Sequence, residues 1–188
     1  MIPGNWQNVE PAKEGKRLPA GGYIARIKEV ENDTKREFIK ITFDIAEGPY
    51  TGYYADLYER AHFWAGTFVR SYKPKAAGFF RTFLDNLNAS NPALQIIAPD
   101  GSVNELQFVG KAIGVIIGLE EYEANDGTIK TRERVKETAP AEKIRAGEFT
   151  VPELKKLARA ETVPAVEVVD TTQSMPQGFD QLTEELPF

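Results

Sequence analysis

The chain has 188 residues, which is enough for one domain of ordinary size with an appendage. Apolar residues make up 41% and charged residues 27%, a normal globular composition that excludes a wholly disordered or fibrous chain. The lack of cysteine excludes disulfide scaffolds, thiolate zinc sites, iron–sulfur clusters and cysteine nucleophiles. No apolar run approaches the ~20 residues that span a bilayer, so we expect a soluble cytoplasmic protein.

The net charge of −5 is unevenly distributed along the chain. Residues 161–188 contain six Asp and Glu and no Lys or Arg, whereas the rest of the chain holds all 23 basic residues against 22 acidic ones. The acidity therefore belongs to the C-terminal segment, which also shows no periodicity. We expect a flexible N-terminal arm over residues 1–17, a folded domain over 18–160 and a disordered acidic tail over 161–188.

Three strands are predicted in the first third of the domain. Residues 23–31 alternate between apolar and polar positions, as a half-buried strand does. Residues 37–46 show the clearest period-two pattern, so these two segments should form a hairpin. Its second strand has one apolar face: Ile39, Ile41, Phe43 and Ile45. Residues 50–58 are rich in tyrosine and predict a third strand.

A helix and two further strands follow. Residues 75–87 carry apolar side chains at helical spacing, and we expect these to form the buried face of a helix: Phe79, Phe80, Phe83, Leu84 and Leu87. Residues 108–122 and 128–136 predict a hairpin around the turn Asn125-Asp126-Gly127. Pro152 at a first helical position predicts a short C-terminal helix to about residue 160. The order β-β-β-α-β-β predicts a mainly β protein with an OB-fold, a five-stranded Greek-key barrel with a helix between strands three and four.

Few residues could support catalysis. His62 is the only histidine, so a two-histidine metal site is impossible, and we expect it to be a packed or surface residue. The segment Gly110 to Gly114 lacks the spacing of a phosphate-binding loop. We therefore expect no enzyme, metal or cofactor, although a nuclease that uses only Asp and Glu to hold a metal stays open as an alternative.

Aromatic and basic residues are interleaved between Tyr50 and Phe83, a window that holds 11 of the 20 aromatic residues. Single-stranded nucleic acid suits this mixture, because bases stack on rings while Lys and Arg neutralise phosphates. Four rings are candidates either for stacking or for the core: Tyr53, Tyr54, Trp64 and Tyr72. Three cations and a proline lie close together within residues 70–75, and the cations are candidates for phosphate contact: Arg70, Lys73 and Lys75.

The last predicted strand carries a basic row. Period two places four cations on one side of it about 7 Å apart: Lys130, Arg132, Arg134 and Lys136. Such a row fits a bound phosphate backbone, and it equally fits an edge strand that is protected by charge against aggregation. The nearby aromatic window favours ligand contact, and we assign phosphate binding to Lys130, Arg132 and Arg134.

The tail ends in Glu184-Glu185-Leu186-Pro187-Phe188. It resembles the C-terminal tail of bacterial and phage single-stranded-DNA-binding proteins, in which an acidic linker ends in an apolar residue, Pro and a terminal Phe. The resemblance implies that Leu186, Pro187 and Phe188 bind replication or recombination proteins. The Phe ring would enter an apolar pocket and the carboxylate would meet a basic rim.

The body over residues 20–155 also resembles a phage-encoded family of OB-fold single-stranded-DNA-binding proteins. Three segments carry the resemblance: 63–68 (FWAGTF), 109–111 (VGK) followed by 118–122 (GLEEY), and 143–147 (KIRAG) with Pro152 after it. It implies strand protection in phage DNA replication or recombination inside the bacterial host cytoplasm, without strong sequence preference. A homodimer or cooperative binding is expected, because one barrel contacts few nucleotides. The alternative is a phage accessory module that binds protein and not DNA.

Overall fold

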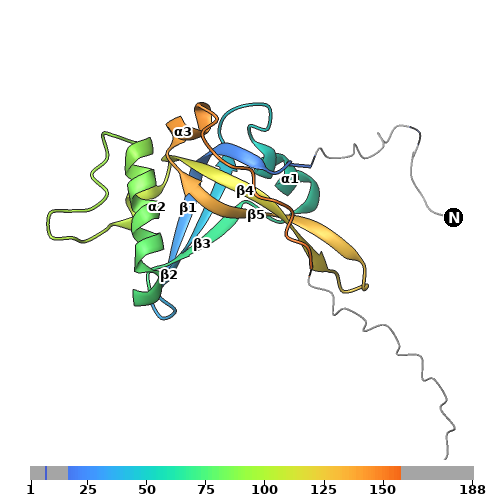
Figure 1. Cartoon of the computed structure of the whole chain (residues 1–188), viewed down its shortest axis with the longest axis horizontal. Coiled ribbons are helices and arrows are strands. Elements are labelled where there is room, and N and C mark those ends of the chain that lie inside the picture. Colours follow the sequence, from blue (N-terminus) through green and yellow to red (C-terminus); the bar gives the residue numbers. More distant parts are fainter. Residues whose placement is uncertain (1–6, 8–16, 158–188) are drawn as a thin grey trace, which may run out of the picture. The chain divides into compact units, whose positions relative to one another are not determined.

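The computed structural model describes residue 7 and residues 17–157. One antiparallel sheet of five strands dominates it, with strand order β3-β2-β1-β4-β5 (Figure 1). The strands are β1 (Gly21–Asp33), β2 (Phe38–Ile45), β3 (Thr67–Ser71), β4 (Ala112–Glu123) and β5 (Ile129–Ala139). Helix α1 (Tyr53–Ala61) precedes β3, α2 (Ala77–Ser90) lies between β3 and β4, and α3 (Ala141–Arg145) follows β5. Within the described residues, no helix has the length and apolar character that crossing a membrane requires.

The predicted N-terminal hairpin is confirmed. β1 and β2 pair antiparallel, and the apolar face of β2 is in the core, with Ile39, Ile41, Phe43 and Ile45 at most 2% exposed. Period-two alternation brings these side chains to one face, where they pack under α2. The helix contributes Phe83, Leu84 and Leu87 to the same core. This confirms the predicted helix between strands three and four.

The prediction of a third strand at residues 50–58 is wrong, because this segment turns into α1 and the third strand comes later, at Thr67–Ser71. Gly52 has φ of 77°, a left-handed conformation that ends the extended chain before the helix. Buried Asp44 on β2 accepts a hydrogen bond from the Tyr54 amide at 3.0 Å and so satisfies a free donor of the first turn. Tyr53, Tyr54 and Leu57 have helical spacing, which overrides the strand preference of tyrosine.

β4 and β5 form a long hairpin that extends past β1. β1 pairs with β4 only between Ala112 and Ile117, whereas β5 pairs with β4 as far as Glu123. We call residues 118–134 the arm, which runs away from the rest of the sheet in Figure 1. Its turn at residues 125–127 matches the sequence prediction, with Gly127 at φ of 75°.

The prediction of a helix from Pro152 to residue 160 is wrong over the described part, residues 151–157. Here the chain is extended beside the arm: the Lys155 amide donates to the Leu119 carbonyl at 3.0 Å, and the Glu121 amide donates to the Lys155 carbonyl at 2.9 Å. Val151 and Leu154 are exposed in this extended segment. The short C-terminal helix is α3, at residues 141–145.

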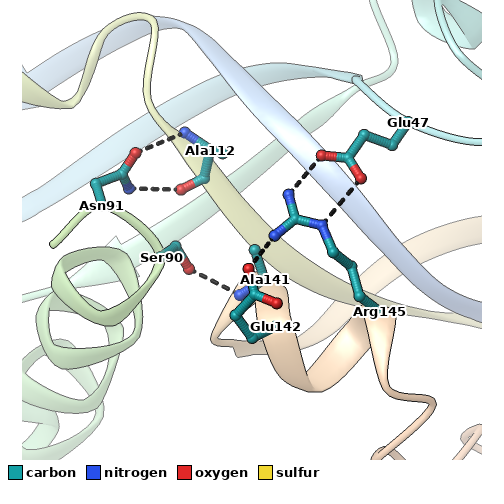
Figure 2. Close-up of polar contacts among 7 residues, drawn as sticks. All are labelled: Glu47, Ser90, Asn91, Ala112, Ala141, Glu142 and Arg145. Carbon is teal, nitrogen blue, oxygen red and sulfur yellow. Dashed lines mark hydrogen bonds and ion pairs between the residues drawn. The ribbon is translucent and has the colours of Figure 1, made fainter.

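Polar contacts fix α2 and α3 to the sheet at the end opposite the arm (Figure 2). The Asn91 carboxamide donates to the Ala112 carbonyl at 2.8 Å and accepts from the Ala112 amide at 3.2 Å, as a neighbouring strand would. The Ala141 amide donates to Ser90 Oγ at 2.9 Å. Arg145 bridges Glu142 and Glu47, and its hydrogen bonds lower the pKa of the Glu47 carboxyl. These contacts hold β4 and β5 at their base while the arm extends.

Candidate nucleic-acid interface

A groove of about 600 Å³ lies between α1, the segment after it and the arm. We call it the arm groove. Its two main walls, residues 53–67 and 122–134, are far apart in the sequence. They come together because β3 and β5 lie at opposite ends of the strand order and curve toward each other. Four arginines, three aromatic rings with an accessible part and one carboxylate line it: Arg17, Arg60, Arg132, Arg134, Tyr53, Phe63, Tyr122 and Glu133.

The cations of β5 converge on one carboxylate. Glu120 on β4 accepts hydrogen bonds from Arg132 at 2.8 Å and from Arg134 and Lys136 at 3.0 Å. Register explains this, because Glu120 faces Arg132 across the two strands and period two places Arg134 and Lys136 on the same side of β5 as Arg132. We call these four residues the Glu120 cluster. Its formal charge is +2, and both arginine side chains stay about half exposed, at 47% and 52%.

The pKa of Glu120 reflects this arrangement. Partial burial raises the pKa of the carboxyl, but hydrogen bonds from Lys136, Arg134 and Arg132 outweigh burial and lower it to about 2. Glu120 is therefore charged throughout the physiological range. Lys130, the first cation of the predicted row, lies nearer the turn, where its ammonium contacts Asp126 at 3.3 Å. All four predicted cations thus lie on β5, and three of them bind the Glu120 carboxylate.

The rings of α1 differ in their access to the groove. Tyr53 is half-buried, and its hydroxyl donates to Glu133 at 3.3 Å and accepts from the Leu18 amide at 3.2 Å. Burial, followed by the charge of Glu133, raises its pKa. Tyr54 is only 3% exposed and packs edge-on against Phe43 at 5.3 Å. A ring so buried offers no face to a base, so Tyr54 belongs to the core and we withdraw it as a stacking residue.

Trp64 fixes the turn between α1 and β3. Its indole N–H donates to the Phe43 carbonyl at 3.1 Å and to the Gly66 carbonyl at 3.2 Å. Its partly buried ring lies tilted against Tyr58 at 6.0 Å. A Cβ on Gly66 would overlap the Phe43 carbonyl and the Tyr54 ring, so glycine is required there. The contacts of Trp64 and Gly66 therefore position Phe63, the residue before Trp64, which is 56% exposed in the arm groove.

A second groove, of about 560 Å³, lies between β3, the start of α2 and β5. We call it the seam groove. Arg70 and Lys136 line it with one carboxylate, Glu137. The Arg70 guanidinium lies 4.7 Å from the centre of the Phe68 ring and donates to the Val69 carbonyl at 3.0 Å. Burial lowers the pKa of the Arg70 guanidinium, but an arginine side chain keeps its charge in a protein.

The other predicted residues lie beyond the end of β3. Tyr72 is half-buried, its hydroxyl donates to Asn32 at 3.0 Å beside the β1–β2 turn, and its ring packs edge-on against Phe80 at 5.8 Å. Lys73 and Lys75 are exposed around the short 3₁₀ turn Pro74–Ala76. The structure thus places some of the predicted residues at the arm groove, the seam groove and this corner. Three others lie elsewhere: Tyr54 in the core, Trp64 in the turn before β3 and Lys130 near the β4–β5 turn.

Several residues were missed as candidates from the sequence. Phe63 and Arg60 were in the aromatic window but were not singled out, although neighbouring Phe, Trp and Arg around a helix end were the available signal. Tyr122 lies on the arm with the Arg132 guanidinium 5.1 Å from its ring centre. Phe79 was assigned to the core and is 78% exposed. Successive residues of a helix are turned by about 100° around its axis, so the Phe79 side chain points roughly 90° away from the mean direction of the buried side chains of α2.

His62 is exposed at the end of α1. Within residues 7 and 17–157, no group of three or more acidic or histidine side chains has the geometry to hold a metal ion. Leu186, Pro187 and Phe188 lie outside the described residues, as does the predicted acidic tail. So does the flexible N-terminal segment predicted over residues 1–17, apart from residues 7 and 17.

Searches for relatives find no family model that matches the chain and no match among curated proteins.

Proposed function

We propose that this protein is a non-catalytic binding protein for single-stranded DNA, with little sequence preference, whose body is an OB-fold. The strand order β3-β2-β1-β4-β5, with a helix between β3 and β4, supports that fold. If β3 and β5 paired with each other, a sheet with this order would close into a five-stranded Greek-key barrel. Contact between β3 and β5 further supports it.

The observation that carries the proposal is the arm groove, where four arginines and three rings with an accessible part face one carboxylate. Single strands combine a charged backbone with unstacked bases, and binding grooves for them pair cations with aromatic platforms. The half-exposed arginines of the Glu120 cluster supply phosphate contacts, while Phe63 and Tyr53 supply the ring faces. None of these contacts reads a base edge, so the preference for sequence should be weak.

Arginine substitutions test this assignment. Arg132→Ala with Arg134→Ala removes two phosphate contacts, so the slope of log K against log salt should fall in magnitude by about 1.4, at about 0.7 per contact for single strands. The matched control is Lys28→Ala with Lys143→Ala, which removes two charges that are exposed on β1 and α3. Equal loss of oligo-dT affinity in both double variants would leave only non-specific charge and would contradict the arm groove as the site.

We also propose that the protein acts in phage DNA replication or recombination and recruits partners through Leu186, Pro187 and Phe188. The support is the sequence of the tail, in which acidic residues precede an apolar residue, Pro and Phe. A chain that lacks these three residues should keep its affinity for DNA and lose replication or recombination proteins in a pull-down from host extract. Capture of the same proteins by both chains would contradict the role of the tail.

A further inference from the structure

Phe79 is the most exposed large apolar side chain of the described residues, at 78%. It lies in the first turn of α2 and lines the seam groove together with Val69 and Thr82. A benzyl group left in water at this position gains nothing for the fold, because Phe83, Leu84 and Leu87 already form the buried face of α2. Its ring face is accessible, and cations lie on the opposite wall of the groove.

Those cations are held in place before any ligand arrives. The Arg70 guanidinium packs over the Phe68 ring and donates to a backbone carbonyl, which leaves further N–H donors on its five-donor group. Lys136 is fixed by its hydrogen bond to Glu120 at 3.0 Å. Glu137 is the acidic residue of this groove, so the lining carries a formal charge of +1.

The seam groove continues the arm groove. The arm groove borders Thr67 of β3 and residues 131–134 of β5, and the seam groove borders residues 69–71 and 136–138 of the same two strands. The Glu120 carboxylate joins them, because it contacts Arg134 of the first groove and Lys136 of the second, each at 3.0 Å. A backbone that follows the cations of β5 therefore passes from one groove into the other.

We propose that Phe79, Arg70 and Lys136 form a second nucleotide subsite, occupied by the same single strand that fills the arm groove. The strand runs along the seam of β3 and β5. A base stacks on Phe79, and Arg70 and Lys136 contact the phosphates beside it. This inference rests on the proposed function and adds to it the path of the DNA over the protein and a stacking residue on α2.

A length series of oligo-dT with Phe79→Ala tests the subsite. An oligomer of about 12 nucleotides spans both grooves and one of about 4 fills the arm groove, within the range of 4 to 16 nucleotides per OB-fold. Phe79→Ala should weaken binding of the longer oligomer about fivefold or more, the effect of losing one stacked base, and leave the shorter one within twofold. The control is Leu106→Ala, which removes another exposed apolar side chain, 69% exposed before β4.

Direct contact is tested by ultraviolet crosslinking of the longer oligomer to the full chain, with mass spectrometry of the peptides. A crosslinked peptide that contains Phe79 supports the subsite. If the parent chain and Phe79→Ala bind oligo-dT with equal affinity and no peptide with Phe79 is crosslinked, the subsite is overturned. The proposed function then stays intact, because the parent chain still binds DNA. No binding by the parent chain would overturn both. Loss of a dimer in Phe79→Ala, seen by light scattering without a change in DNA affinity, would assign Phe79 to a contact between two copies and also overturn it.

Discussion

Replacing Glu120 with Gln should strengthen binding of single-stranded DNA. Glu120 holds Arg132, Arg134 and Lys136 at 2.8–3.0 Å, so its charge opposes any phosphate that approaches these cations. A phosphate on the outer side of an arginine lies about 6 Å from the carboxylate, since each charge-assisted hydrogen bond spans about 2.8 Å. At that distance the repulsion is about 0.7 kcal/mol in water, or about threefold in affinity.

The water value is a lower bound, because the two arginines are about half exposed whereas the Glu120 side chain is only 13% exposed. Glu120→Gln should also steepen the slope of log K against log salt by about 0.7, because one more cation becomes available to a phosphate. The assay is an anisotropy titration of labelled oligo-dT at several salt concentrations. Glu142→Gln is the control, since it removes a carboxylate from Arg145 on α3 without touching either groove. Weaker binding by Glu120→Gln would refute the reasoning and make Glu120 a residue that positions the cations.

Three further predictions concern stability and stacking. Gly66→Ala should lower the free energy of unfolding, measured by urea titration, by about 1–3 kcal/mol, because its Cβ would overlap a β2 carbonyl and a ring of α1. Gly78→Ala on α2 has open space, so it should raise the free energy of unfolding by about 0.5–1 kcal/mol. Glu120 has a folded-state pKa of about 2 against an ordinary value of 4.5, so the stabilisation that its charge provides is complete above about pH 4.5 and lost as the pH falls toward 2. The difference in unfolding free energy between the parent chain and Glu120→Gln should therefore shrink between these two pH values. A difference that stays constant would contradict this. Phe63→Ala should weaken oligo-dT binding about fivefold or more, and Tyr58→Ala, on the preceding helix, should not.

Periodic segments were predictable from the sequence because local rules decide them. The apolar face of β2 repeats every second residue, and its four members are all buried. The helix between strands three and four follows from apolar spacings of three and four, although its first turn was misjudged at Phe79. That position lies at the margin of the buried arc, where the end of the sheet and not the sequence pattern decides exposure.

Segments whose structure depends on distant partners were not predictable. The tyrosine-rich segment before β3 becomes a helix partly because Asp44, ten residues earlier on another strand, accepts the amide of Tyr54. Residues near Pro152 extend because the arm presents a free edge to Lys155. The arm groove likewise combines side chains from residues 53–67 with those from 122–134, and only the curvature of the sheet brings them together.

The most direct test of the central claim is a fluorescence-anisotropy titration of labelled oligo-dT with the full chain and with a chain ending at Glu161, each at two salt concentrations. We expect both chains to bind, and both more weakly at high salt. The shorter chain should bind more tightly, because it lacks the five acidic residues that follow Glu161 and compete for the basic groove. Absence of binding by both chains at low salt would contradict the proposed function and would favour a protein-binding module.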